Sequence, residues 1–251
     1  MTLRTGTLVL LSLALSAYAY SGTAPSATDN NIPIHLGTAD SFALLGGSGI
    51  TNVSASTFIV GDVGSSPTPS VTGLTQSQVQ GRLYLKSNAV TAKAQTDLTV
   101  AYDEAVAAPC GNDLTGKDLG GLRLDPGVYC FSSSAQLTGT LTLDAHGNPN
   151  PQWIFQTGST LTTASDSKVV IIHSKKGQCP RGCNVYWQIG SSATVGTGSR
   201  FMGIIMALES ITLDGGVLRG KALARNGAVT MSAQETVVGA ACQRRRQVPN
   251  Y

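Results

Sequence analysis

Short segments in which polar and apolar residues alternate recur through the second half of the chain. The threonines Thr160, Thr194, Thr212 and Thr230 lie within such segments, at steps of 34, 18 and 18 residues, and the longer first step contains the loop 175–184. A repeat of this length, built from three short strands with Gly-rich corners, is typical of one coil of a three-sided solenoid. Because one coil cannot bury its own apolar side, stacked coils form the core. The pattern therefore predicts a mainly β protein, a β-solenoid.

The alternation also assigns side chains to the inside and outside of one solenoid side. Positions about 4.8 Å apart between strands and 6.6 Å apart along them would form a flat array. The predicted inward ladder is Leu137, Leu161, Val195, Leu213 and Met231. The predicted outward rows are Gln136, Thr160, Thr194, Thr212 and Thr230, and beside them Thr138, Thr162, Gly196, Asp214 and Ser232.

The other two sides differ in polarity. On one side, consecutive residues of each segment are apolar, although they point to opposite faces of the strand, which indicates strands buried on both faces. These segments are 128–131, 153–155, 185–187, 204–206 and 222–224. The third side carries Lys168, Arg200 and Arg219, which we expect to face solvent.

One long helix is predicted between about 87 and 108. Val90, Ala94, Leu98, Ala101 and Ala105 form one apolar stripe, and Pro109 and Gly111 end the helix. A helix of this length spans about 30 Å, enough to cover several stacked coils. We expect it to cover the doubly apolar side. Before it, 42–45 and 56–60 are typical of one further coil, joined to the helix region by the Pro/Gly/Ser-rich stretch 61–73.

The amino terminus is typical of a secretory signal peptide. Arg4 precedes an apolar stretch from Leu8 to Ala17, followed by the small-x-small pattern Ala17-Tyr18-Ala19. The predicted organisation is a signal peptide (1–19), an extension (20–36), the solenoid domain (37–242) and a basic tail (243–251). No second apolar run is long enough to anchor the chain. We therefore expect a secreted monomer with no membrane attachment after cleavage.

Charge argues against several functions. Only 12% of residues are charged, and Arg4 with Arg244–Arg246 contributes four of the positive charges in a net charge of +3, which leaves −1. This gives no electrostatic reason for nucleic-acid binding. Most of the carboxylates sit near Gly or Ser, as turn formers do, and no repeating pair is visible among them. They are Asp125, Asp144, Asp166, Glu209 and Asp214. Neither enzymatic activity nor a cofactor is predicted.

Five cysteines in a secretory context predict disulfides. We expect Cys110–Cys130, which would tie the helix exit to the coil at Gly127, and Cys179–Cys183, with Cys242 unpaired. The competing pairing, Cys183–Cys242, would span about three coils, roughly 14 Å by the strand spacing, which is too far for a bridge.

Two further motifs concern modification and metal binding. Asn52-Val53-Ser54 is a sequon, which makes Asn52 a glycosylation candidate. Cys179 and Cys183 have a spacing seen in metal sites, but no histidine lies near them in the sequence, so no metal site is predicted.

Several motifs together, in order and spacing, resemble the ice-binding-like family (DUF3494-type antifreeze proteins) over about 37–241. They are 42–45 (FALL), 61–64 (GDVG), 125–129 (DPGVY), 153–156 (WIFQ), 184–190 (NVYWQIG) and 220–224 (GKALA), and 157–160 (TGST) is similar to a Thr-small-x-Thr pattern of some members. The resemblance implies a discontinuous right-handed β-solenoid of triangular section, with one long helix alongside and the N-terminal coil stacked on the last coil. It implies no catalytic residues and no cofactor.

The predicted function is that of a secreted antifreeze protein that adsorbs to ice and inhibits ice growth and recrystallisation. The resemblance implies that one flat solenoid face binds the ice crystal. Thr suits such a face because it offers a methyl and a hydroxyl on a stiff χ1. The alternative is an extracellular carbohydrate-binding or matrix/adhesion solenoid module without catalysis.

Overall fold

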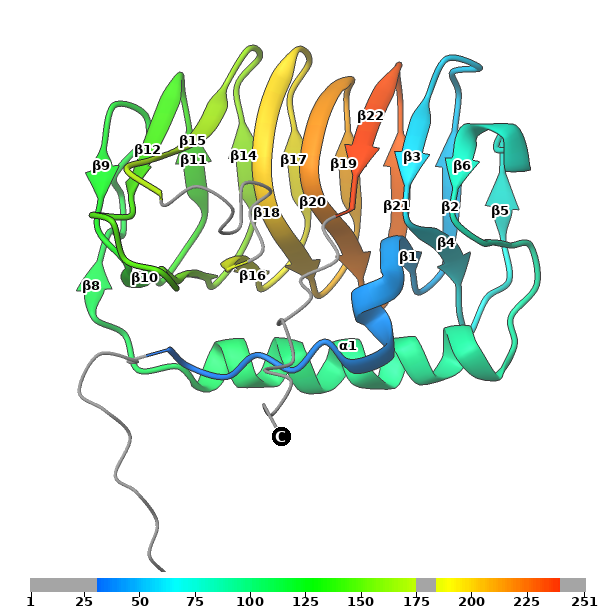
Figure 1. The fold of residues 1–251 in the computed structure, drawn as a ribbon, viewed down its shortest axis with the longest axis horizontal. Helices are drawn as coiled ribbons and strands as arrows, with labels where there is room; N and C mark the ends of the chain where they lie inside the picture. The colour runs from blue at the N-terminus through cyan, green and yellow to red at the C-terminus, as the bar shows by residue number, and fades with distance from the viewer. Residues whose placement is uncertain (1–30, 175–183, 240–251) are drawn as a thin grey trace, which may run out of the picture. The chain divides into compact units, whose positions relative to one another are not determined.

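The computed structural model describes residues 31–174 and 184–239, which form a three-sided solenoid of parallel strands with one long helix, α1 (Ala89–Ala107), alongside (Figure 1). The predicted β-solenoid fold is confirmed. Two short 3-10 helices, η1 (Gly37–Ser41) and η2 (Gln76–Gln78), lie in the N-terminal part of this region.

Each side of the solenoid is a ladder of parallel strands. The threonine face consists of β11 (Ala135–Leu137), β14 (Leu161–Thr163), β17 (Ala193–Val195), β19 (Ile211–Leu213), β21 (Ala228–Met231), β2 (Gly49–Asn52) and β5 (Val71–Thr72), in that order. The cationic face consists of β9 (Arg123–Leu124), β12 (Thr140–Asp144), β15 (Lys168–Ile172), the first halves of β18 (Ser199–Ala207) and β20 (Gly216–Ala224), β22 (Glu235–Val238), β3 (Phe58–Val60) and β6 (Val79–Gln80).

The third side, the helix face, lies under α1. It consists of β8 (Asn112–Asp113), β10 (Gly127–Phe131), β13 (Trp153–Thr157), β16 (Val185–Ile189), the second halves of β18 and β20, β1 (Phe42–Gly46), β4 (Asp62–Ser65) and β7 (Leu83–Tyr84). As predicted, its strands are buried on both sides, because one side contributes to the solenoid core and the other packs against α1.

The N-terminal segment is stacked on the last coil rather than on the coil that follows it in sequence. β1 pairs with β20, β2 with β21 and β3 with β22. A second coil, β4 to β6, stacks on this one, where the sequence pattern predicted a single coil. The helix then carries the chain back along the solenoid to the coil that begins at β8 (Figure 1).

Aromatic rings stack along the solenoid interior. The centroid distances are 5.5 Å from Tyr129 to Phe155, 4.0 Å from Phe155 to Trp187 and 4.9 Å from Trp187 to Phe201. Stacked parallel coils place equivalent residues above one another, so a bulky ring in one coil contacts a ring in the next. This column of rings joins successive coils within the solenoid core.

The helix packs against the solenoid through the predicted apolar stripe, except at its first position. Asn88 caps it by accepting from the backbone N–H groups of Val90 and Thr91. Ala94, Leu98, Ala101 and Ala105 are buried as predicted, but Val90 is exposed. Thr91, one residue later, is buried instead, because its hydroxyl is satisfied by the capping turn, where it donates to Asn88 O.

A disulfide joins Cys110 to Cys130, as predicted, and ties the helix exit to β10. The predicted Cys179–Cys183 bridge, Cys242, the signal peptide and the basic tail lie outside the described residues. Over the described ranges, no helix has the length and apolar character needed to cross a membrane.

Candidate functional site

The threonine face presents one unbroken outward row of neutral side chains. Strand register aligns its members one to a coil: Gln136, Thr162, Thr194, Thr212, Thr230, Thr51 and Thr72. Every member is exposed or half-exposed, while the residues on both sides of each Thr within the strands point inward. We call this row the threonine row. It is a straight array of hydroxyl and methyl groups on a parallel sheet.

Most hydroxyls of the threonine row have no protein partner. Among the described residues, the side chains of Thr162, Thr194, Thr212 and Thr230 form no hydrogen bond with the protein, whereas Thr72 Oγ1 lies 3.4 Å from Thr51 Oγ1. A hydroxyl that bonds no protein group is available to water. Most of the row is therefore available to water, and the row carries no charge.

The structure corrects the predicted register at one coil. Leu161 pairs with Ala193 and Thr162 with Thr194, so Thr162 and not Thr160 belongs to the row. In the predicted inward ladder, the position between Leu137 and Val195 is therefore occupied by the buried Thr163 and not by Leu161. The Thr163 hydroxyl is satisfied there, because the backbone N–H of Gly196 donates to it at 3.0 Å. Leu161 is also buried but is aligned with Ala135 and Ala193.

Thr160 lies before its strand begins, in a flanking row of small polar residues. Its hydroxyl is 2.9 Å from that of Ser134. Ser192 and Ser210 continue this flanking row, since the Oγ of each accepts a hydrogen bond from the backbone N–H of the next coil. The flanking row widens the neutral surface on one side of the threonine row.

The second predicted outward row lies at the corner between the threonine and cationic faces. Thr138, Asp214 and Ser232 follow their strands directly, and Gly196 occupies the same place but is buried. Ser232 Oγ donates to Asp214 Oδ1 at 2.6 Å. This row therefore borders the flat array and turns away from it.

Sequence reasoning missed Thr51 and Thr72. Both follow a β-branched apolar residue, Ile50 and Val71 respectively, as Thr212 follows Ile211 and Thr230 follows Val229. This pair, a β-branched apolar residue followed by Thr, was the sequence signal that could have identified them.

The glycosylation candidate Asn52 lies on β2 beside Thr51. It is only 5% exposed, and its Nδ2 donates to Ser54 O and Gly73 O. In the folded coil this side chain has no free amide N–H to modify.

A buried carboxyl lies beneath the corner row. Glu235, on β22, is 3% exposed, and its backbone N–H donates to Thr57 Oγ1. Burial raises the pKa of the Glu235 carboxyl to about 7, although hydrogen bonds with the backbone of Gly215, Leu218 and Thr236 oppose the shift. The charge of the neighbouring Asp214 carboxylate also raises the pKa of Glu235.

Two of the carboxylates that the sequence analysis interpreted as turn formers, Asp125 and Asp144, both contact His146 at another corner, between the cationic and helix faces. Asp144 is fully buried and is contacted by the Arg123 guanidinium and by His173 Nδ1, the latter at 2.9 Å. His146 Nε2 lies 2.6 Å from Asp125 Oδ1. Burial disfavours the Asp144 carboxylate, but its hydrogen bonds outweigh this and hold the pKa of Asp144 well below its usual range. Among the described residues, no group of His, Cys, Asp or Glu side chains could hold a metal ion.

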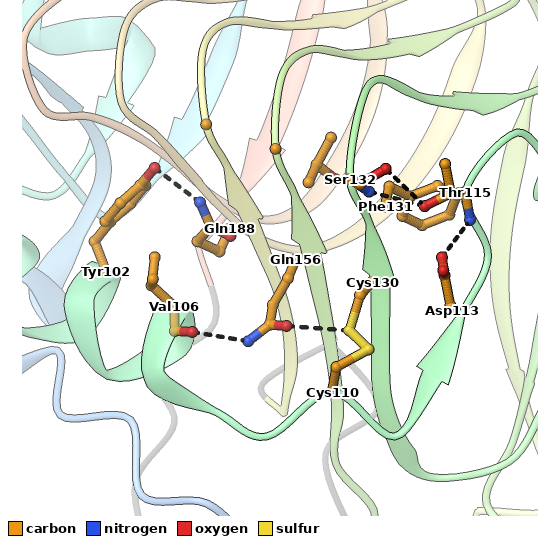
Figure 2. Close-up of a pocket in the computed structure, with 13 residues that line it drawn as sticks. Tyr102, Val106, Cys110, Asp113, Thr115, Cys130, Phe131, Ser132, Gln156 and Gln188 are labelled. Carbon is orange, nitrogen blue, oxygen red and sulfur yellow. Dashed lines mark hydrogen bonds between the residues drawn. A yellow bond between two sulfur atoms is a disulfide. The ribbon is translucent and has the colours of Figure 1, made fainter.

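A groove of about 500 Å³ lies between the end of α1 and the helix face (Figure 2). Its two glutamine side chains already have protein partners, whereas the buried Thr157 hydroxyl has none among the described residues. Gln156 Nε2 donates to Ala105 O and Ala108 O, and Gln188 Nε2 donates to the hydroxyl of Tyr102. The groove therefore lies where side chains of the solenoid hydrogen-bond to the helix. The candidate functional site is the threonine face.

Comparison with known proteins agrees with this geometry. The family model for ice-binding-like proteins matches residues 44–237. The chain is 48% identical over 238 residues to an ice-binding protein of Nostoc sp. (strain HG1), covering 94% of this chain and 84% of that one. It is 30% identical over 246 residues to an ice-binding protein of Flammulina populicola, covering 90% and 96%.

Solved structures give the same result. The crystal structure of an ice-binding protein from an Antarctic biological consortium superposes with a TM-score of 0.75 at 38% identity, covering 92% of this chain and 96% of that one. An ice-binding protein from the Antarctic ascomycete Antarctomyces psychrotrophicus gives a TM-score of 0.73 at 31% identity, covering 82% and 98%. The chain belongs to the ice-binding-like family.

Proposed function

We propose that this protein is a secreted, monomeric antifreeze protein that adsorbs to ice through its threonine face and so inhibits ice growth and recrystallisation. The observation that carries the proposal is the threonine row, a straight, uncharged array of hydroxyls that mostly have no partner among the described residues. The relatives reported above, all ice-binding proteins, support it. Secretion is supported by the signal-peptide pattern at 1–19.

Ice recognition requires a rigid, weakly polar surface. Ice carries no charge and consists of water, so a receptor gains most from holding a layer of water molecules in a regular arrangement. Neighbouring strands set a repeat of about 4.8 Å across the row. Each Thr presents a methyl group that fixes where water is excluded and a hydroxyl that fixes where water is bonded. The regular spacing repeats this unit from coil to coil.

Packing keeps the array flat. Directly beneath the row lie fully buried apolar residues of the same strands, including Leu161, Ile211 and Val229. Since these residues belong to one continuous core with the aromatic column, a single strand cannot move without disturbing its neighbours. The row thus meets ice as a preformed surface, and little conformational entropy is lost on binding.

The test is a protrusion in the middle of the array. Thr212→Tyr places a large ring at the centre of the row and lifts neighbouring contacts off the ice together, so we expect a sharp loss of thermal hysteresis with an unchanged melting temperature. Lys168→Tyr, on the cationic face, is the matched control and should keep activity. Loss in the control with retention in Thr212→Tyr would place the site on the other face, and retention in both would exclude the threonine face.

A partition measurement tests ice binding without reference to a face. When a dilute solution is frozen slowly, an ice-binding protein enters the growing ice, whereas a protein that does not bind ice is left in the liquid. We expect the wild-type protein in the ice fraction and Thr212→Tyr mainly in the liquid. Wild-type protein left in the liquid would contradict the proposed function itself.

A further inference from the structure

The cationic face combines unpaired positive charges with half-buried apolar residues. Lys168 on β15 is paired in register with Arg200 on β18, and Arg219 on β20 lies opposite Met202. The outward residues of this face form two rows: Thr140, Lys168, Arg200, Val217, Thr236 and Phe58, and Arg123, Thr142, Val170, Met202, Arg219, Val238, Val60 and Gln80. Neither row contains an acidic residue.

Three of these cations have no partner in the described structure. Lys168, Arg200 and Arg219 are exposed and form no ion pair or side-chain hydrogen bond with any described residue, whereas Arg123 contacts Asp144. Like charges opposite one another on adjacent strands destabilise a sheet. In a chain with so few charged residues, this concentration indicates a surface that is neutralised by something outside the protein.

The cationic face also carries apolar side chains that reach solvent. Phe58 is 44% exposed, and Val217 and Met202 are only partly exposed. α1 covers a different side of the solenoid, and no described element covers this one (Figure 1). The face can therefore accept a ligand that has flat apolar surfaces and negative charges at its edges.

We propose that the cationic face binds a linear acidic polysaccharide that carries carboxylate or sulfate groups. Sugar rings have C–H faces that can lie on Val217, Met202 and Phe58, while the anionic groups reach Lys168, Arg200 and Arg219. The strand spacing of about 4.8 Å is close to the length of one sugar ring, so successive rings can follow successive strands. This binding adds to ice adsorption, because the threonine face points in another direction.

Two other polyanions fit the face less well. Single-stranded nucleic acid binds through bases stacked on aromatic rings, and Phe58 is the only aromatic residue in the two described rows. A lipid surface takes up several exposed apolar side chains, but Val217 and Met202 are only partly exposed, and Phe58 is the one large apolar residue of the two rows that is clearly exposed. Both become outcomes of the test.

The experiment measures binding of the whole protein to alginate and to dextran sulfate at low ionic strength, with uncharged dextran as the reference polymer. We expect binding to one or both acidic polymers, none to dextran, and weakening as salt is added, since exposed charges are screened. The variant K168Q/R200Q/R219Q should bind at least about tenfold more weakly. Its melting temperature should equal or exceed that of the wild type, because it removes exposed cations that have no partner among the described residues and that repel one another across the strands.

The basic tail and the threonine face supply the matched controls. Arg244→Gln, Arg245→Gln and Arg246→Gln together remove the three cations of the basic tail and should keep most of the binding, and Thr212→Tyr should keep all of it. The proposal is overturned by unchanged affinity in the triple variant, by loss of binding only in the tail variant, or by no binding to either acidic polymer. Tighter binding of single-stranded DNA or phosphatidylglycerol vesicles through the same three cations would assign the face to that partner instead.

Discussion

Gln156 on β13 terminates the helix that covers it, because its Nε2 donates to Ala105 O at 2.8 Å and to Ala108 O at 2.7 Å. The last carbonyl groups of a helix have no partner within the helix and need one from elsewhere. Here a strand side chain supplies the donor, so the position of α1 along the solenoid is set by hydrogen bonds as well as by apolar packing.

Gln156→Leu should therefore lower the stability of the protein. The substitution keeps the approximate volume but leaves partly buried carbonyl groups without a donor, an expected loss of about 1–3 kcal/mol. For a domain of this size, that is a fall of several degrees in melting temperature. Gln136→Leu is the control, since Gln136 is exposed and makes only a 3.4 Å contact with Thr138. Equal melting temperatures for the two variants would show that Gln156 does not hold the helix end.

Docking of the helix should also depend on Leu98. This residue is fully buried in the cluster that joins α1 to Ile154, Ile204 and Leu223. Leu98→Asp places a carboxyl in an apolar seam and should cost several kcal/mol, measured by thermal or denaturant unfolding. Val100→Asp, at a position 47% exposed on the same helix, should change stability by less than about 1 kcal/mol. Because α1 lies away from the threonine face, folded Leu98→Asp protein should keep its ice activity.

The helix and the character of each side were predictable because they rest on strong periodic patterns. Leu98, Ala101 and Ala105 recur at helical spacing with no Gly or Pro, and the doubly apolar strands required a cover. The disulfide Cys110–Cys130 followed from the expected place of the helix exit. Periodicity identifies elements of this kind well, because many residues contribute to the same signal.

The register at β14 could not be predicted in the same way. A slip of two residues keeps every side chain on its own side of the sheet, so alternation fits Leu161-Thr162-Thr163 in either register. What decides is a buried hydroxyl: Thr163 can point inward because the N–H of Gly196 bonds to it. That hydrogen bond joins residues 33 positions apart and leaves no local signal in the sequence.

Protein stability should depend on pH through Glu235. Its pKa is about 7 in the folded chain against a usual 4.5, so the folded protein holds the proton more tightly than the unfolded chain. The resulting stabilisation is complete below about pH 4.5 and is lost as the pH rises through 7, about 3 kcal/mol in all. Glu235→Gln cannot ionise and should lack this decline. The check is the free energy of unfolding of both proteins at pH 5 and pH 8. Parallel changes in the two would mean that this carboxyl is solvated in the folded state.

The N-terminal coil should take part in ice binding although it is distant in sequence from the rest of the array. Thr51 is paired in register with Thr230, which extends the threonine row beyond the coils of the second half of the chain. Thr51→Tyr should therefore reduce thermal hysteresis at unchanged melting temperature, as Thr212→Tyr does, though less strongly because Thr51 lies nearer the end of the row. Thr236→Tyr, on the cationic face of a neighbouring coil, is the control and should keep activity. If Thr51→Tyr keeps full activity while Thr212→Tyr loses it, ice contacts only the coils from β11 to β21.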